Sequence, residues 1–279
     1  MGIRRSAIGV FDSGVGGLSV MREIAKLLPE EEIIYFADSI HCPYGKRSLR
    51  EIRGFSQGIV RFLLDQGAGV VVVACNTASA AALSYLREKF SVPIVGMEPA
   101  VKPAALTTRS GKVGVIATKV TFQGELFAKL IERFATNVEV YTQVCPSLVE
   151  RVEAGLLDDP ETEGLLRAYL RPMLKAGIDT LVLGCTHYSF LRRTIEGIVG
   201  PEVRVIDPCF AVARQTKRVF EREGLRGEGR GEHLFYTSGD PRVFTEMVKR
   251  LIGERGKVKG TLWEKLEGEW RLYPKSGLG

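Results

Sequence analysis

Several features that define common protein classes are missing from this sequence. No Cys-x-x-Cys pair occurs, so the chain has neither a typical zinc-finger site nor a thioredoxin-type redox motif. No run of 18 apolar residues occurs, so we expect no membrane span and no membrane partner. Lys and Arg number 39 against 33 Asp and Glu, without a basic stripe that has interleaved aromatics. We therefore expect no nucleic-acid partner.

The signatures of phosphate-binding and hydrolytic sites are also missing. The glycine-rich segment 12–17 is not followed by Gly-Lys-Ser/Thr, and Ser19 stands where a dinucleotide fingerprint has its third glycine. No Gly-x-Ser-x-Gly nucleophile elbow of a serine hydrolase occurs. Cysteine phosphatases need an arginine six positions after the nucleophile, and the corresponding positions hold Ala81 and Leu191. The sequence therefore gives no sign of a nucleotide cofactor or of these hydrolases.

Five cysteines are present, at wide spacings: Cys42, Cys75, Cys145, Cys185 and Cys209. Their odd number and irregular spacing do not suggest a disulfide framework. Free thiols in a chain of 279 residues are typical of a reducing compartment, so we expect a cytoplasmic protein.

Short apolar runs alternate with longer stretches of helical periodicity. The runs are rich in Val and Ile, which is typical of parallel strands buried on both faces. Strand, helix and strand in this order predict a doubly wound α/β architecture. The predicted strands are 7–11, 33–37, 70–74, 93–97, 113–117, 138–141, 180–183 and 203–206, and the predicted helices are 47–64, 77–90, 121–134, 162–175 and 241–252, with a Gly-rich loop at 222–232 and a short polar-alternating tail at 262–273.

The two halves of the chain resemble each other. Segments 71–77 and 181–187 are each an apolar strand that ends in a small residue, a cysteine and polar residues able to open a helix. The two cysteines, Cys75 and Cys185, are 110 positions apart. We expect two related α/β domains with a boundary near 98–103, and each cysteine at the carboxyl end of a strand, where open α/β sheets bind ligands.

Each of these cysteines precedes the expected start of a helix. The helix dipole and free backbone N–H groups stabilise a thiolate there, so we expect a lowered thiol pKa, with Thr77 or Ser79 as the cap after Cys75. A single cysteine at such a place is more often a small buried hydrophobe. Two cysteines at equivalent places in two repeated halves favour a catalytic function instead.

Two thiols that face one ligand from opposite domains suit racemisation. One group removes a proton from one face of a carbon, and the other returns a proton to the opposite face. In an amino acid, the developing negative charge needs hydrogen-bond donors, which backbone N–H groups together with Asn76, Thr77 and Thr186 can supply. The residues thus predict a cofactor-independent amino-acid racemase.

Two further side chains flank the cysteines. His187, one of three histidines, lies two positions after Cys185 and can act as a proton partner or hold a thiolate as an ion pair. A zinc role for His187 would need more ligands, and none is near in the sequence. Asp12 can serve Cys75 in a similar way, although an aspartate at a strand end is more often a helix cap. The glycines after Asp12 allow close approach to a ligand or form a plain strand–helix turn.

Several stretches together resemble the bacterial glutamate racemases of the cofactor-independent aspartate/glutamate racemase superfamily. They occur in order between positions 8 and 213, and they are 11–18, 37–39 with 43–45, 74–79, 114–118 and 183–188. The resemblance implies two similar doubly wound parallel-sheet domains that face each other across a cleft, with the last segment returning to the first domain. The predicted domains are therefore 1–98 plus about 210–279, and 99–209.

The resemblance also implies the reaction and its bases. It implies interconversion of L- and D-glutamate without cofactor or metal, with D-glutamate supplied to peptidoglycan synthesis. In that family the cysteine matching Cys75 deprotonates D-glutamate, and the one matching Cys185 deprotonates L-glutamate.

Other positions match the family's assisting and substrate-binding residues. Asp12 and His187 match assisting residues, and Glu153 is the best match for an assisting glutamate, with Glu150 left as an alternative. The positions that match substrate contacts are Asp12, Ser13, Tyr44, Gly45, Asn76, Thr77, Thr186 and His187.

Two other functions stay open at this point. An aspartate racemase of the same superfamily is less favoured, because those enzymes typically have an acidic residue where this chain has His187. A non-catalytic amino-acid-binding protein would not need two symmetric cysteines. Ser39 and Ser189 depart from the usual family pattern, and Cys42 lies directly before Pro43 without an evident role. The partners that we expect are glutamate and a second copy of the chain, as a homodimer.

Overall fold

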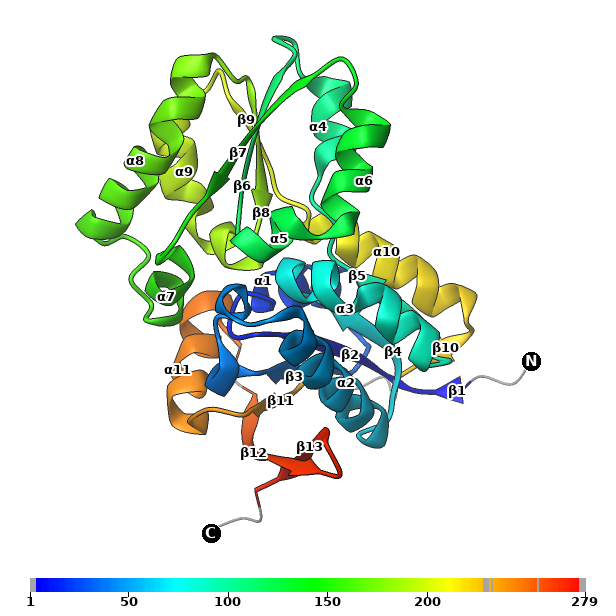
Figure 1. Cartoon of the computed structure of the whole chain (residues 1–279). Helices are drawn as coiled ribbons and strands as arrows, with labels where there is room; N and C mark the ends of the chain where they lie inside the picture. The colour runs from blue at the N-terminus through cyan, green and yellow to red at the C-terminus, as the bar shows by residue number, and fades with distance from the viewer. Residues whose placement is uncertain (1–3, 228–230, 232, 255, 276–279) are drawn as a thin grey trace.

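The computed structural model describes residues 4–227, 231, 233–254 and 256–275. They form two lobes, each built on its own β-sheet, and Figure 1 shows one lobe above the other. The part of the chain on the seven-stranded sheet is termed the first lobe, and the part on the four-stranded sheet the second lobe. The predicted fold class, two parallel-sheet α/β units, is confirmed.

The strands are β1 (Arg4–Arg5), β2 (Ala7–Asp12), β3 (Ile33–Ala37), β4 (Ala68–Val73), β5 (Ile94–Gly96), β6 (Lys112–Ala117), β7 (Glu139–Val144), β8 (Thr180–Gly184), β9 (Arg204–Ile206), β10 (Leu225–Arg226), β11 (His233–Thr237), β12 (Lys257–Leu266) and β13 (Glu269–Pro274). The α-helices are α1 (Leu18–Leu27), α2 (Leu49–Asp65), α3 (Asn76–Lys89), α4 (Val101–Thr107), α5 (Lys119–Gln123), α6 (Glu125–Phe134), α7 (Leu148–Glu153), α8 (Pro160–Ala176), α9 (Arg192–Val199), α10 (Cys209–Arg222) and α11 (Pro241–Ile252). The 3-10 helices are η1 (Ser39–His41), η2 (Tyr44–Lys46) and η3 (Thr186–Leu191).

The sheet of the first lobe has the order β13-β12-β11-β3-β2-β4-β5. Its strands run parallel, except for the antiparallel hairpin β12–β13 at one edge. The end of the chain therefore returns to the first sheet. The tail predicted at 262–273 is mostly this hairpin, in which Trp263 and Trp270 pack on Phe55 of α2. Alternating polarity fits an edge hairpin because only one of its faces is covered.

The second lobe repeats the arrangement of the first. Its parallel sheet has the order β7-β6-β8-β9, and the first four strands of the first lobe have the order β3-β2-β4-β5. In both lobes the first strand lies between the second and the third, so β4 corresponds to β8 and β2 to β6. Successive strands are added first on one side of β2 and then on its other side, so the direction of the sheet's growth reverses between β2 and β4. The same reversal occurs between β6 and β8. Open α/β sheets bind ligands at the carboxyl ends of such strand pairs.

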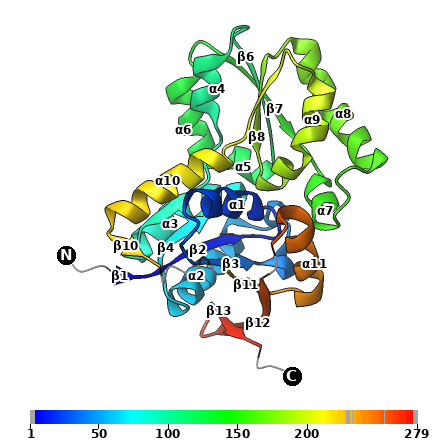
Figure 2. The ribbon, with the colours of Figure 1, turned by 180° about the vertical axis from the view of Figure 1, so that it is seen from behind.

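Helices cover both faces of each sheet. In the first lobe α1, α10 and α11 pack on one face, while α2 and α3 pack on the other. In the second lobe α8 and α9 pack on one face, and α4 and α6 on the other. The apolar cluster under α1 and α10 continues into the layer of α8 and α9, and α10 lies along the junction of the lobes in Figure 2. One continuous core thus fixes the two lobes against each other.

Two sequence predictions need correction. The helix predicted at 121–134 is two helices, α5 and α6, that meet at Gly124. A Cβ on Gly124 would lie 2.8 Å from the Ala80 Cβ of α3. The break is therefore set by a contact between helices, which hydrophobic periodicity in the sequence cannot predict. The predicted loop 222–232 contains the short strand β10, and residues 228–230 and 232 lie outside the described residues.

The other predicted helices agree with the structure within a few residues, and α11 has the predicted limits 241–252. Among the helices of the described residues, none is long and apolar enough to cross a membrane.

Candidate active site

Cys75 lies at the carboxyl end of β4 and opens α3. Its Sγ accepts a hydrogen bond from the backbone N–H of Ala78 at 3.4 Å, so the cysteine itself is the N-cap of the helix. Its thiol also points to Ser13 Oγ, 4.0 Å away. Cys75 is buried, and its position after β4 places it at the strand reversal of the first sheet.

Two expectations about Cys75 are wrong. Neither Thr77 nor Ser79 caps α3, because Ser79 Oγ instead donates to a strand carbonyl and the Cys75 sulfur takes the capping place. The pKa of the Cys75 thiol is raised rather than lowered. Burial is the largest cause, the negative charge of Asp12 adds to it, and the hydrogen bond from the helix start only partly offsets both.

Cys185 lies at the equivalent end of β8, next to a buried histidine–glutamate pair. His187 Nδ1 is 3.8 Å from Cys185 Sγ, and His187 Nε2 is 2.6 Å from Glu153 Oε1. Burial lowers the pKa of His187, but hydrogen bonds with Cys185, Cys42 and Glu153 outweigh it and raise that pKa well above the usual value. Burial raises the pKa of Glu153, but the contact with His187 outweighs it and lowers that pKa. The pair is therefore an imidazolium and a carboxylate, with one imidazolium N–H facing Cys185.

Asp12 ends β2 and joins the two lobes. Thr186 Oγ1 of the second lobe donates to Asp12 Oδ2 at 2.9 Å, and the N–H of Gly14 donates to Oδ1 at 2.8 Å. Burial raises the pKa of the Asp12 carboxyl to about 6, against the opposing effect of His187 and these hydrogen bonds. The Asp12 carboxylate thus lies within electrostatic reach of both Cys75 and His187.

The glycine-rich turn after Asp12 brings its backbone against side chains of the second lobe. The backbone N–H of Val15 donates to Glu153 Oε1 at 2.8 Å. A Cβ on Gly14 would collide with the Glu153 carboxylate, and one on Gly16 would collide with the His187 ring. Glycine is required here because protein side chains, rather than a phosphate group, occupy the space beside the backbone.

The start of α3 offers polar groups beside Cys75. The side-chain nitrogen and oxygen of Asn76 are buried and have no hydrogen-bond partner within the described part of the chain. Thr77 Oγ1 lies 2.9 Å from Thr118 Oγ1 of the second lobe, and a Cβ on Gly45 would lie 3.3 Å from the Thr118 side chain. Buried amide groups are usually paired, so the free Asn76 side chain is suited to a bound ligand.

Tyr44 and Glu150 contact partners other than the two cysteines. Tyr44 is buried, but its hydroxyl donates to Asp38 Oδ2 at 2.7 Å. Of the two candidate glutamates, Glu150 pairs with Lys46 Nζ at 2.6 Å, whereas Glu153 contacts His187. The geometry thus separates two side chains that are three positions apart in the sequence.

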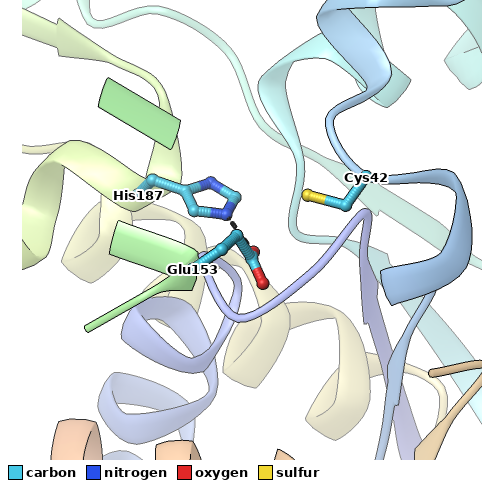
Figure 3. Close-up of side chains that lie close together, drawn as sticks. All are labelled: Cys42, Glu153 and His187. Atoms are coloured by element: carbon cyan, nitrogen blue, oxygen red, sulfur yellow. Dashed lines mark hydrogen bonds and ion pairs between the residues drawn. The ribbon is translucent and has the colours of Figure 1, made fainter. Parts of the chain in front are cut away.

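Two neighbours of the site were not singled out from the sequence. Thr118 directly follows β6 as Ser13 directly follows β2, so the internal repeat carried a signal for it. Cys42 approaches His187 and Glu153, and the three ligand atoms lie within 4.8 Å of one another (Figure 3). Of the described residues, these three form a group that could hold a metal ion. Burial raises the pKa of the Cys42 thiol to about 12.

Known proteins share this architecture and much of the sequence. Residues 8–216 match the model of the Asp/Glu/Hydantoin racemase family. The glutamate racemase of Pseudomonas aeruginosa is 50% identical over 260 residues, which cover 92% of this chain and 98% of that protein. The glutamate racemase isoform RacE1 of Bacillus anthracis superposes with a TM-score of 0.82 at 37% identity, over 91% of this chain and 96% of that one.

A second solved structure is the Escherichia coli glutamate racemase in complex with L-glutamate and the activator UDP-MurNAc-Ala. It has a TM-score of 0.82 at 35% identity, over 92% of this chain and 98% of that one. The chain described here belongs to the Asp/Glu/hydantoin racemase family. It is a racemase and therefore an isomerase.

Proposed function

We propose that this racemase interconverts L- and D-glutamate by two-base proton transfer at the α-carbon. The observation that carries the proposal is the pair of cysteines at equivalent ends of β4 and β8, close enough for Cys185 to influence the pKa of Cys75. Glutamate as substrate is supported by the relatives in Pseudomonas aeruginosa and Bacillus anthracis, and by the L-glutamate bound in the Escherichia coli protein.

The two thiols lie in different environments. The His187 side chain, held by Glu153, presents Nδ1 to Cys185 Sγ at 3.8 Å and is placed to exchange a proton with it. Cys75 keeps its proton because burial and Asp12 raise its pKa. Cys185 then removes the α-proton of L-glutamate, and Cys75 delivers its own proton to the opposite face. With D-glutamate as substrate the two cysteines exchange roles.

Hydrogen-bond donors around the substrate stabilise the charge that develops when the α-proton leaves. The free amide of Asn76 and the backbone N–H groups at the starts of α3 and η3 are available for the substrate carboxylate. Ser13, Gly45, Thr77 and Thr186 complete the proposed contacts, and Tyr44 supports them from the position next to Gly45. Thiols as bases and fixed donors for the carboxylate make the chemistry independent of a cofactor or metal.

Substrate choice is tested by circular dichroism of the purified protein without added cofactor. We expect the signal of L- or D-glutamate to decay to zero, and aspartate to remain unchanged. Faster loss of the aspartate signal would favour an aspartate racemase. Binding of glutamate without decay would favour an amino-acid-binding protein.

The two-base mechanism is tested in heavy water and with cysteine variants. Early product should carry α-deuterium while recovered substrate carries little, because each base exchanges its proton with solvent. Cys75→Ala and Cys185→Ala should each lower racemisation by roughly 1000-fold or more, and the double variant should not multiply the losses, since the two bases act as a unit. Product that retains its original α-hydrogen would indicate a single base. Near-normal racemisation by either single variant would remove that cysteine from the mechanism.

Other expectations stay predictions. They are the domain limits of 1–98 plus about 210–279 and 99–209, a homodimer, a cytoplasmic location and the supply of D-glutamate to peptidoglycan synthesis. Sedimentation of the purified chain tests the homodimer directly.

A further inference from the structure

A mixed cluster of potential metal ligands lies beside the proposed bases. It consists of the Cys42 thiol from the loop between η1 and η2, the Glu153 carboxylate at the end of α7, and the His187 imidazole in η3. Their ligand atoms lie within 4.8 Å of one another, and Figure 3 shows the Cys42 sulfur directed at the other two side chains. The first lobe provides the sulfur and the second lobe the nitrogen and oxygen, so the cluster exists only where the lobes meet.

The chemistry of these donors selects one kind of cation. Sulfur, imidazole nitrogen and carboxylate oxygen together suit Zn²⁺, whereas Mg²⁺ and Ca²⁺ prefer oxygen ligands alone. Tetrahedral zinc with its usual bond lengths brings such ligand atoms to about 3.3–3.8 Å from one another. To reach these distances, the His187 Nε2–Glu153 Oε1 pair, now 2.6 Å apart, opens by about 1 Å, and separations near the 4.8 Å limit contract by about 1 Å. Side-chain rotation can supply movements of this size. Three protein ligands and a fourth position for water are the composition of an open zinc site.

The surroundings also fit a buried metal site. His187 is 2% exposed, and the backbone N–H of Val15 holds the Glu153 carboxylate in place. Such hydrogen bonds to a ligating carboxylate orient it and increase affinity. A cation bound here replaces the hydrogen bond between His187 and Glu153 and lies beside the Cys42 sulfur.

We infer that Cys42, Glu153 and His187 form an inhibitory site for Zn²⁺ or a similar soft divalent cation. The bound cation takes His187 and Glu153 as ligands, so His187 no longer has the contacts with Glu153 and Cys185 that it makes in the metal-free chain. Racemisation then stops until a chelator withdraws the metal. The binding site stands on geometry alone, and only its inhibitory effect rests on the proposed function.

Metal binding is measured first, without reference to activity. Metal-free protein is titrated with Co²⁺, which reports a bond to thiolate by near-ultraviolet charge-transfer absorption, and Zn²⁺ is counted by equilibrium dialysis. We expect one Zn²⁺ per chain and a cobalt–thiolate band that Zn²⁺ abolishes. Cys42→Ala should lose the band and weaken Zn²⁺ binding at least about 100-fold, because changes outside the ligand shell already cost 10- to 100-fold.

A matched control is Cys209→Ala. Cys209 is also a buried free cysteine, but its sulfur contacts Ser19 and Ser189 at 3.3 Å each, away from the cluster. This variant should bind Co²⁺ and Zn²⁺ like the unmodified chain. A band that persists in Cys42→Ala would place the cation on another thiol, such as Cys75 or Cys185, and would overturn the site.

Inhibition is measured second, with glutamate as substrate. Zn²⁺ should inhibit the unmodified chain and Cys209→Ala, with full recovery in chelator. Cys42→Ala, compared with its own rate without zinc, should need at least about 100-fold more Zn²⁺ for the same fractional inhibition. Zinc that occupies the Cys42 site without slowing racemisation would overturn the inhibitory role. A protein that binds zinc as expected but does not racemise glutamate would refute the proposed function and leave the site standing.

Discussion

Asp12 shows at the level of one residue how the site holds a charge at a cost in stability. The side chain is fully buried, and its carboxyl pKa rises from 3.8 to about 6 because burial outweighs the hydrogen bonds from Gly14 and Thr186. Since the folded pKa exceeds the unfolded one, the protonated form favours folding. That contribution is fully present below about pH 4 and is lost as the pH rises through about 6.

Asp12→Asn tests this cost. The unmodified chain loses stability as its buried Asp12 ionises, and the variant does not. Relative to the unmodified chain, the free energy of unfolding of the variant should therefore rise by about 1–2 kcal/mol between about pH 5 and pH 7.5. Urea unfolding at both pH values measures the difference. Racemisation should fall strongly in the same variant, because the amide carries no charge for the site.

The matched control is Asp179→Asn. In spite of partial burial, hydrogen bonds from Thr108, Ser110 and Arg109 lower the pKa of Asp179 to about 2. Its ionised form contributes stability that is lost only as the pH falls through about 2, so its effect should be the same at pH 5 and 7.5. If the free energies of unfolding of Asp12→Asn and the unmodified chain differed by the same amount at both pH values, the raised pKa of Asp12 would be contradicted.

At the level of elements, the turn between β2 and α1 depends on two glycines. Their backbone faces Glu153 and the His187 ring directly, with no room for a side chain. The turn therefore determines how closely the first lobe approaches His187 of the second.

Gly16→Ala should displace His187 and Thr186 and lower kcat by roughly 100-fold, because misplacing a reacting group by about 1 Å has costs of this order. Gly164→Ala in the exposed part of α8 is the control, since an added Cβ there meets nothing within 4 Å. That variant should keep full activity and gain up to about 1 kcal/mol, because alanine favours a helix. Normal turnover by Gly16→Ala would show that the turn can shift without moving His187.

The whole molecule brings the two halves of one site together from separate sheets. Cys75 and Asn76 belong to the first lobe, and Cys185, Thr186 and His187 belong to the second. A ligand that contacts both sets of residues should stabilise the folded chain as one unit, since it binds only when the lobes are in place.

Glutamate at about 100 times its dissociation constant should therefore add about 2.7 kcal/mol to the free energy of unfolding, measured as a rise in Tm. Asn76→Ala should reduce this shift while leaving the Tm of the free protein nearly unchanged, because the side chain has no partner there in the described structure. An equal shift with aspartate would argue against glutamate as the preferred ligand. Loss of stability in Asn76→Ala without glutamate would show a structural role instead.

The sequence by itself determined the features that depend on neighbouring residues. Val- and Ile-rich runs defined the strands, and the repeated strand–cysteine segments predicted that Cys75 and Cys185 occupy equivalent strand ends. The glycines after Asp12 predicted either close approach to a ligand or a plain strand–helix turn, whereas the structure has Glu153 and His187 against Gly14 and Gly16. These features could be predicted because strand periodicity and turn chemistry are local.

Only the tertiary structure decided which distant side chains meet and how much water they lose. It brought Glu153 rather than Glu150 to His187, placed Cys42 beside that pair, and turned the Tyr44 hydroxyl to Asp38. It also reversed the expected direction of the Cys75 pKa. A helix start favours a thiolate locally, but the desolvation that outweighs it arises from the packing of two lobes that the chain assembles from segments far apart in sequence.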